Sequence, residues 1–191
     1  LSAASAGSLS LLHLAQQLHS AASQIVAKAF AVPAITQLAA AHKQGDQARF
    51  ALRLTRTLWI MLAICLGGVV ALWLVGQPLL ASGMAHGKFT STHAHELWVL
   101  LLLSAGMFVA GAMGTLTAGA FYAQGDTRTP TWLGSLAFTA GIALKVVMFN
   151  HFGVQGLAVA ISVYFMSSLG IQCLVLWRRG GMRQFATGAN S

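Results

Sequence analysis

The stretch LWIMLAICLGGVVALWLV, residues 58–75, holds 18 consecutive apolar residues and decides the class of fold. As a helix it would be about 27 Å long, close to the ~30 Å hydrocarbon core of a bilayer. The composition of the whole chain also indicates a membrane protein. Of its 191 residues, 57% are hydrophobic and 7% are charged, whereas about 25% are charged in a typical soluble domain. The sequence therefore predicts an all-α integral membrane protein.

Four further apolar segments accompany this one, separated by turns rich in Gly, Pro and charge. We expect about five transmembrane helices, at residues 9–41, 50–76, 97–122, 131–149 and 154–177. The membrane bundle would thus cover residues 9–178, after a loop or the end of a preceding helix at 1–8 and before a polar tail at 179–191. Pro78 is expected to end the second helix, and the short turn 150–153 to make the last two helices antiparallel neighbours.

A polar line marks the first of these helices. It consists of residues three or four positions apart, namely His13, Gln17, Ser20, Gln24 and Lys28. This spacing places them on one face of a helix, and because lipid cannot satisfy polar side chains, that face should meet protein or a water-filled cavity. We predict that the line borders a substrate cavity in which Lys28 attracts anions. The structural alternatives are pairing of Lys28 with backbone carbonyls and hydrogen bonds from Gln17 and Gln24 to other helices. Pro33 should kink the same helix.

Two further features concern the later helices. Lys145 lies within a predicted span, five residues before Asn150. This position favours snorkelling to the outer interface, and the alternative, which places Lys145 with the residues of the substrate cavity, stays open. Small residues recur every fourth position in the third helix, at Gly106, Ala110, Gly114 and Ala118. Such a ladder lets a neighbouring helix approach closely, so we expect Gly114→Leu to separate the two helices.

Basic residues predict the orientation in the membrane. Eight of the 11 lie on one side of the predicted spans, namely Lys43, Arg49, Arg53, Arg56, Arg128, Arg178, Arg179 and Arg183. By the positive-inside rule this side is cytoplasmic, which makes the C-terminus cytoplasmic and the N-terminus periplasmic, with Lys88 on the outer side. The chain starts at Leu1 without a basic segment leading into a short apolar core, so we expect no signal peptide and a piece of a longer protein.

Several classes of function find no support in the sequence. The formal charge of +8 does not indicate nucleic-acid binding, because the basic residues lie in short clusters between apolar runs without interleaved aromatics. Cys65 and Cys173 lie within apolar runs, which favours free thiols. The connector histidines His86, His93 and His95 are interpreted as solvated loop residues, with metal binding as the alternative. With three acidic residues and no nucleophile motif or phosphate-binding Gly loop, we expect neither an enzyme nor a cofactor.

A ten-residue turn carries a family resemblance. Residues 121–130, FYAQGDTRTP, resemble the MviN/MurJ family of lipid II flippases, within the MATE-like exporter superfamily. The segments 87–89, GKF, and 152–160, FGVQGLAVA, are similar to family segments as well. The dipeptide Gly-Asp of this turn also occurs 80 residues earlier, at 45–46, in the other predicted cytoplasmic turn.

The resemblance implies a fold and an activity. It implies helices eight to twelve of a fourteen-helix protein, most of its second six-helix bundle, with the first bundle as a partner. It also implies alternating access in the bacterial inner membrane, with a lipid II-like polyprenyl-pyrophosphate-linked sugar precursor moving through a cavity between the bundles. The turns and cytoplasmic gate would be set by Gly45, Asp46, Gly125, Asp126 and Arg128.

Two positions depart from the family pattern and keep other functions open. Gln17 stands where the family usually has an Arg, and Lys145 lies where the family has Asn or an acid. A small-molecule antiporter of the same superfamily would favour an acidic residue in the cavity, and the five predicted spans contain none. A transport-inactive scaffold that recruits cell-envelope enzymes is favoured by the loss of the basic residue at position 17.

Overall fold

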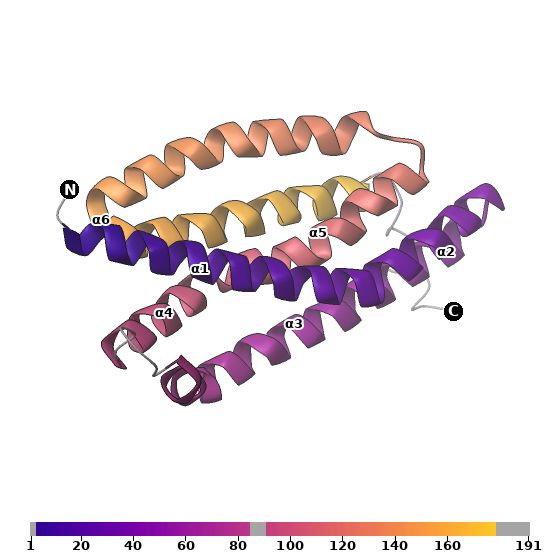
Figure 1. Cartoon of the computed structure of the whole chain (residues 1–191). Coiled ribbons are helices and arrows are strands. Elements are labelled where there is room, and N and C mark those ends of the chain that lie inside the picture. The colour runs from indigo at the N-terminus through magenta and orange to yellow at the C-terminus, as the bar shows by residue number, and fades with distance from the viewer. Residues whose placement is uncertain (1–2, 85–90, 179–191) are drawn as a thin grey trace, which may run out of the picture.

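The computed structural model describes residues 3–84 and 91–178, with side chains over 7–80 and 92–178. Every regular element in this described part is helical. The long helices lie side by side in an elongated bundle (Figure 1). The predicted tail, the connector residues His86 and Gly87, and the basic residues Lys88, Arg179 and Arg183 lie outside the described residues.

The first helical run carries a π-helical segment immediately before Pro33. It consists of α1 (Ala3–Val26), the π-helix η1 (Ala27–Ala31) and α2 (Val32–Lys43). The backbone N–H of Val32 donates to the carbonyl of Ala27, five residues earlier. Because proline cannot donate to the carbonyl four residues before it and its ring clashes there, the wider π turn accommodates the ring. Figure 1 shows α2 leaving at an angle to α1, as the proline predicted.

This helix also begins earlier than the sequence analysis placed it. Residues 3–8 were expected to form a loop or the end of another helix, whereas α1 includes them. The segment AASAGS is rich in alanine, the residue with the highest helix propensity, and contains no proline. The helix predicted to start at residue 9 therefore extends toward the N-terminus through this segment at little cost in free energy.

The second helix passes through the proline that was expected to end it. Helix α3 covers Gln47–Met84 with Pro78 inside, and its last turns are seen nearly end-on in Figure 1. Six residues before Pro78, the carbonyl of Leu72 accepts from the indole Nε1 of Trp98 at 2.9 Å. Continuing as a bent helix loses one backbone hydrogen bond, whereas unwinding in an apolar setting would expose several. The proline thus redirects the helix.

The predicted third helix is two helices in series. Helix α4 covers Ser91–Leu103 and α5 covers Ala105–Ala123, with Ser104 at φ −95° and ψ 9° between them. The Ser104 hydroxyl donates to the carbonyl of Leu100 at 2.6 Å, a bond that competes with the regular helical ladder. The start at Ser91 also places His93 and His95 on a helix, although the sequence analysis assigned them to a loop.

The last two predicted helices form one folded-back element. Helix α6 covers Arg128–Leu176, and within it Gly153 has non-helical angles, φ 61° and ψ −143°. Figure 1 shows the chain reversing there, so that a first arm (128–152) and a second arm (154–176) run antiparallel. Only glycine adopts such a conformation without strain, which is why the reversal falls at this residue. The first arm begins at Arg128 because proline is tolerated in the first turn of a helix, where Pro130 lies.

Four described helical runs are long and apolar enough to cross a membrane. They are Gly7–Lys43, Gln47–Leu80, Ala105–Ala123 and Arg128–Leu176. The last has 49 residues and would measure about 73 Å if straight, more than twice the hydrocarbon thickness, so its two arms count as separate crossings. The prediction of an all-α membrane protein is confirmed.

Helix α5 lies at the centre of the bundle. It contacts α1, η1, α2, α3 and α6, and it is the most buried of the four candidate spans. Small residues allow this position: a Cβ added at Gly106 would lie 2.9 Å from Cβ of Ser162, and one at Gly111 would lie 3.0 Å from Oγ of Ser23. At Gly119 it would collide with the Ile35 side chain. By contrast, a Cβ at Gly114 meets nothing within 4 Å, so the expectation that Gly114 is a point of close approach is wrong.

Candidate functional site

The polar line predicted for the first helix lies along one face of α1 and η1. The side chains of His13 and Gln17 are exposed, and their Nε2 atoms are 3.1 Å apart. Gln24 donates from Nε2 to the Ser20 hydroxyl at 3.5 Å. Lys28, one turn further, is exposed within the π segment. These hydrogen bonds stay within one helix, so the line keeps a free outer face.

A groove adjoins the middle of the polar line. It has a volume of about 220 Å³ and is lined by Ser20, Ser23 and Gln24 of α1, by Met107, Gly111 and Thr115 of α5, and by Phe165 of α6. The absence of a side chain at Gly111 lets α1 approach α5 here. The hydroxyl of Thr115 is exposed and donates back to the carbonyl of Gly111 at 3.3 Å. The groove thus joins polar side chains of α1 and α5 across an apolar base.

Lys145 lies apart from the polar line, in contact with another element. Its Nζ is 4.9 Å from the centre of the Tyr164 ring, a cation–π contact between the two arms of α6. The side chain is half-buried. Tyr164 also lines a separate groove of about 160 Å³ between the arms, together with Gly141 and Ser167. The contacts of Lys145 therefore place it between the arms of α6 and give no support to its assignment to one cavity with Lys28.

Two buried polar residues of α1 that lie beside the polar line were missed in the sequence. His19 donates from Nε2 to the carbonyl of Leu101 at 2.8 Å and stacks on Phe108, with ring centres 6.1 Å apart. The hydroxyl of Ser23 is 2.7 Å from the carbonyl of His19 and 3.0 Å from that of Phe108. Their spacing of four residues was a signal of a second polar face, which the longer line of five residues obscured.

The two Gly-Asp turns share one pattern of hydrogen bonds. In the first, the N–H of Gly45 donates to the carbonyl of His42 at 3.0 Å and the N–H of Asp46 to that of Ala41 at 3.1 Å. This is the Schellman motif that ends many helices, and it requires a left-handed residue, here Gly45 at φ 70°. Asp46 then begins the next helix by accepting from the N–H of Arg49 at 2.8 Å.

The second turn repeats each of these contacts. The N–H of Gly125 donates to the carbonyl of Tyr122 at 2.9 Å, and the N–H of Asp126 to that of Phe121 at 3.0 Å. Gly125 has φ 77°, and Asp126 accepts from the N–H of Thr129 at 3.0 Å. The aspartates thus serve as helix caps, and the repeated dipeptide reflects a repeated helix–turn–helix connection.

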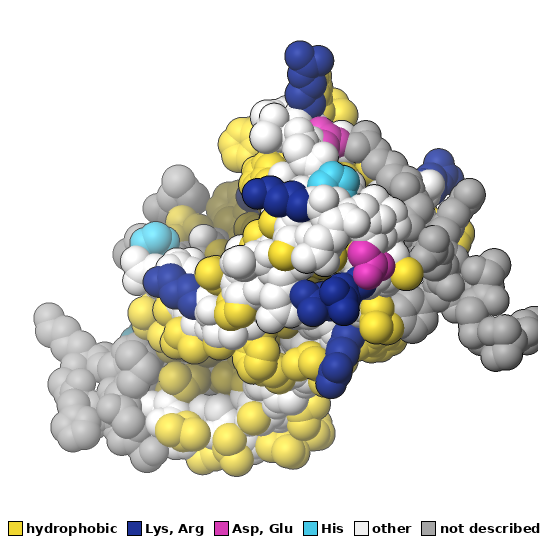
Figure 2. All heavy atoms as spheres, turned by 90° about the vertical axis from the view of Figure 1, so that its right-hand side faces the viewer, with side chains coloured by type: hydrophobic (Ala, Val, Ile, Leu, Met, Phe, Trp, Pro, Cys, Tyr) yellow, Lys and Arg dark blue, Asp and Glu magenta, His cyan; other side chains and the backbone are white. Residues whose placement is uncertain are grey.

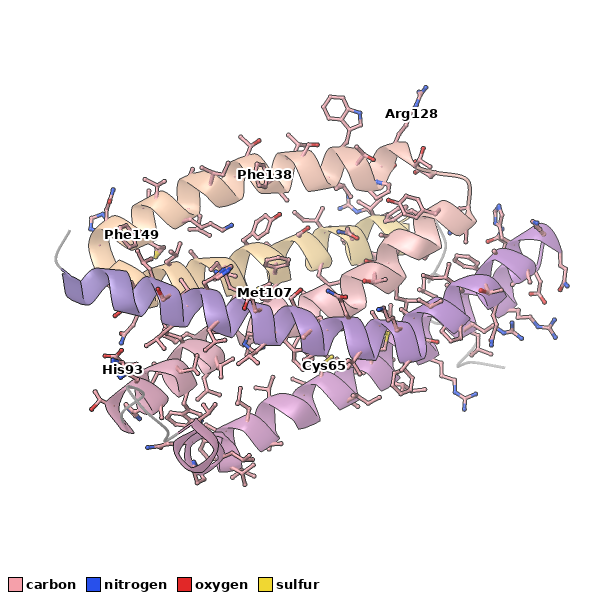
Figure 3. All side chains as sticks on the ribbon, in the orientation of Figure 1. Cys65, His93, Met107, Arg128, Phe138 and Phe149 are labelled. Atoms are coloured by element: carbon pink, nitrogen blue, oxygen red, sulfur yellow. The ribbon has the colours of Figure 1, made fainter. Side chains whose placement is uncertain are left out.

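Both turns lie at the basic end of the bundle. Described basic side chains at this end come from several elements, namely Lys43, Arg49, Arg53, Arg56, Arg128 and Arg178. Figure 2 shows Lys and Arg side chains gathered on this face, with acidic side chains among them. Arg49 lies 3.8 Å from Asp46. Figure 3 places Arg128 at this end and His93 and Phe149 at the other.

Metal-ligating side chains do not gather in the part of the chain that the structure describes. No group of three or more His, Cys, Asp or Glu residues is close enough there to hold a metal ion. His95 instead contacts the ring of Trp98, with ring centres 5.7 Å apart. Cys65 and Cys173 are free thiols, the first buried and the second half-buried.

Comparison with known proteins finds relatives described as probable lipid II flippases. A probable lipid II flippase MurJ of Chlamydia muridarum is 31% identical over 144 residues, which are 73% of this chain and 25% of that protein. One of Rhizobium tropici is 24% identical over 175 residues, 91% of this chain and 33% of that protein. The chain thus spans a quarter to a third of the length of these curated relatives.

A solved structure shares the fold. It is a lipid II flippase MurJ in an inward closed conformation, which superimposes with a TM-score of 0.75 at 16% identity and covers 92% of this chain and 38% of that chain. The family model described as lipid II flippase MurJ matches residues 1–189. With its helical membrane bundle and this match over nearly its whole length, the chain belongs to the lipid II flippase MurJ family.

Proposed function

We propose that the chain forms one wall of the pathway by which a polyprenyl-pyrophosphate-linked peptidoglycan or oligosaccharide precursor is flipped across the bacterial inner membrane. The family and the names of its relatives support this substrate class. Because the chain matches a quarter to a third of those relatives, the other wall would come from a further helical bundle. The proposed role is transport, with no catalytic step by this chain.

The observation that carries the proposal is the polar line on a helix of membrane-spanning length. His13, Gln17 and Gln24 are exposed on α1 although the same run is a candidate span. Within a bilayer such side chains need water or another protein surface. A water-filled pathway would hydrate these side chains, and the groove at Ser20 and Gln24 would widen that pathway.

Lys28 is the residue proposed to contact the substrate. A diphosphate carries negative charge, and a low-dielectric passage disfavours it unless a cation offsets the loss of hydration. Among the five residues of the polar line, Lys28 is the one lysine or arginine, because position 17 holds Gln. Its place in the π segment supports a functional role, because π turns within helices frequently occur at functional sites.

Alternating access would use the irregular points of the helices. The π segment η1, the break at Ser104 and the reversal at Gly153 each interrupt a helical ladder. Such interruptions let one part of a helix tilt while the other stays packed. We assign the two Gly-Asp turns to the cytoplasmic gate, where Asp46 and Asp126 fix the turns and Arg128 adds positive charge.

Replacement of Lys28 tests the proposal. In the full-length protein, Lys28→Gln should lower headgroup translocation roughly tenfold or more, which corresponds to ~1.4 kcal/mol or more in the barrier. Lys28→Arg should be intermediate because it keeps the charge. The measurement is a reconstituted flipping assay with a fluorescent lipid-linked precursor in vesicles.

Lys43→Gln is the matched control for this experiment. Lys43 is exposed in the last turn of α2, so its replacement removes the same charge without touching the polar line and should leave translocation unchanged. Translocation by Lys28→Gln at the parental rate, with normal expression, would contradict the role of Lys28.

Gln17 supports a second candidate, a transport-inactive scaffold. If the parental protein flips no precursor while its full-length form binds cell-envelope enzymes, this second function holds. A small-molecule antiporter is less well supported, because Asp46 and Asp126 are engaged as helix caps at the end of the bundle.

A further inference from the structure

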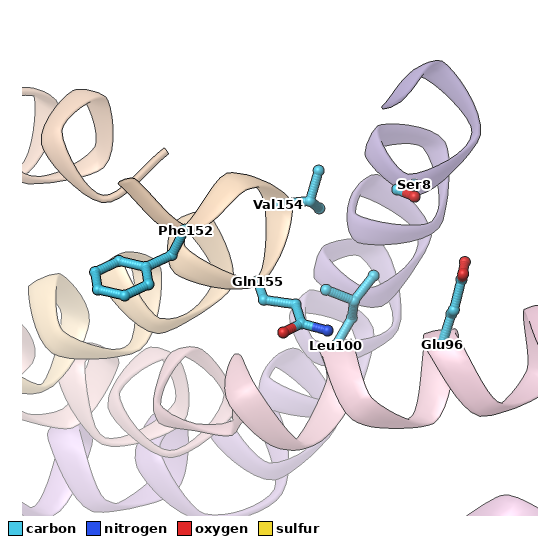
Figure 4. Close-up of a pocket in the computed structure, with 6 residues that line it drawn as sticks. All are labelled: Ser8, Glu96, Leu100, Phe152, Val154 and Gln155. Carbon is cyan, nitrogen blue, oxygen red and sulfur yellow. The ribbon is translucent and has the colours of Figure 1, made fainter. Parts of the chain in front are cut away.

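A further hollow, distinct from the two grooves described above, lies at the end of the bundle opposite the basic end. It has a volume of about 240 Å³, and Figure 4 shows the side chains that surround it. Three elements contribute: α1 with Ser8, α4 with Glu96 and Leu100, and α6 with Phe152, Val154 and Gln155. We call it the outer pocket.

The fold builds the outer pocket from the reversal of α6. At Gly153, with φ 61°, the chain leaves the first arm and starts the second, and the pocket residues of α6 flank this glycine on both sides. Helix α4 contacts both α1 and α6, which brings Glu96 next to the reversal. Leu100 is buried and forms part of an apolar base.

Two polar side chains of the outer pocket are unpaired in the described part of the chain. Glu96 and Gln155 are both exposed. The salt bridge in the described part of the chain joins Arg49 and Asp46, at the basic end of the bundle. Of the three acidic residues in the sequence, the two aspartates cap helices. Glu96 is thus the acidic side chain left available for a ligand.

We propose that the outer pocket binds a primary ammonium group carried on a short apolar stem. An ammonium has three N–H donors and no acceptor, and it matches the Glu96 carboxylate together with the carboxamide oxygen of Gln155. The apolar side chains of Leu100, Phe152 and Val154 would contact the stem. This proposal does not depend on the proposed flipping function.

Charge and ligand chemistry exclude the other classes of ligand. An anion would be repelled by Glu96. A hard divalent cation takes six or more oxygen ligands, commonly from several carboxylates, whereas the outer pocket has one carboxylate. Six of the described basic side chains lie at the basic end, away from Glu96, and Lys145 contacts the Tyr164 ring. These seven side chains therefore do not pair with the Glu96 carboxylate.

Ligand-detected NMR tests the proposal. With full-length protein in phosphatidylcholine nanodiscs at pH 7.5 and n-butylammonium as the probe, we expect saturation transfer to the butyl protons. Glu96→Gln should reduce it at least fivefold, Glu96→Asp should keep part of it, and Gln155→Leu should reduce it to a smaller extent. 1-Butanol, which has the stem without the charge, should show no transfer that depends on Glu96.

Gln47→Leu is the control for Gln155→Leu, because Gln47 is an exposed glutamine at the basic end and its replacement should change nothing. Thermal unfolding curves that coincide with the parent show that a variant is folded. Equal transfer in the parent and Glu96→Gln, or no transfer to the parent at all, overturns the proposal.

The ammonium could belong to a membrane lipid or to a soluble molecule, and a change of lipid separates these sources. If nanodiscs containing phosphatidylethanolamine abolish the Glu96-dependent n-butylammonium signal, the lipid headgroup occupies the outer pocket. If the signal is the same in both types of nanodisc, the ligand is a soluble amine. Either result supports the ammonium site.

Discussion

At the scale of single residues, the small side chains of α5 decide how closely the other helices approach it. A Cβ does not fit at Gly106, which lies against Ser162, or at Gly119, which lies against Ile35. At Gly114, by contrast, a Cβ would have open space around it. The periodic ladder in the sequence therefore contains residues with opposite roles. The neighbours of each glycine, rather than its place in the period, set its sensitivity to substitution.

Alanine substitutions at Gly106 and Gly114 should change stability in opposite directions. Gly106→Ala pushes a methyl group against Ser162 and Met166 and should lower the free energy of unfolding by ~1–3 kcal/mol. Gly114→Ala should raise it by up to ~1 kcal/mol, because alanine favours the helix and meets no obstacle. Thermal unfolding of both variants in detergent measures the difference. A larger loss for Gly114→Ala than for Gly106→Ala would contradict this packing.

At the scale of elements, the break between α4 and α5 is stabilised by side chains from other helices. Ser162 of α6 donates from its hydroxyl to the carbonyl of Leu103 at 2.6 Å and accepts from the N–H of Gly106 at 3.1 Å. His19 of α1 contacts the carbonyl of Leu101 at 2.8 Å. Carbonyls at the end of a helix lack partners within it, so these two side chains replace the missing backbone bonds.

Removal of the Ser162 hydroxyl should destabilise the bundle. Ser162→Ala leaves a carbonyl and an N–H without a partner and should cost ~1–3 kcal/mol of unfolding free energy. Ser167→Ala is the matched control, since Ser167 is exposed on the same arm, and its effect should stay within about 0.5 kcal/mol. Both are measured by chemical unfolding in mixed micelles, where equal effects of the two variants would refute the role of Ser162.

At the scale of the whole molecule, the reversal at Gly153 and the two Gly-Asp turns set which ends of the helices share a side. The turns lie at the basic end, and the reversal lies at the other. By the positive-inside rule the basic end is expected to be cytoplasmic. Together with the passage of the chain from α3 to α4, these three connections join the five crossings.

Cysteine labelling tests this arrangement. With Cys65 and Cys173 replaced, Gln44→Cys and Thr127→Cys should react with an impermeant thiol reagent only from the cytoplasmic side, and His151→Cys only from the periplasmic side. All three native side chains are exposed, so access does not depend on local unfolding. Labelling of positions 44 and 151 from the same side would rule out the five-crossing arrangement.

The sequence by itself determined the class, the approximate spans and the turns. An apolar run of 18 residues needs no tertiary contact to favour a membrane, and the two Gly-Asp turns are local hydrogen-bonded motifs whose glycines require positive φ. The polar line on α1 was likewise readable, because helical periodicity alone places residues three or four apart on one face. The family resemblance, carried by residues 121–130, was confirmed by the family model.

Apart from the kink at Pro33 and the reversal within residues 150–153, only the tertiary structure decided where helices break, bend and touch. Pro78 looked like an end and is the site of a bend in α3, while Ser104, inside an uninterrupted apolar run, ends α4. The energies that settle these points come from partners far along the chain: Ser162 is 58 residues from Ser104 in sequence, yet it bonds the backbone on both sides of the break. His19 was missed for the same reason, since its partner Leu101 is 82 residues away. A local pattern records the preferences of a helix, whereas the cost of interrupting it depends on which distant side chain is present to satisfy the exposed backbone groups.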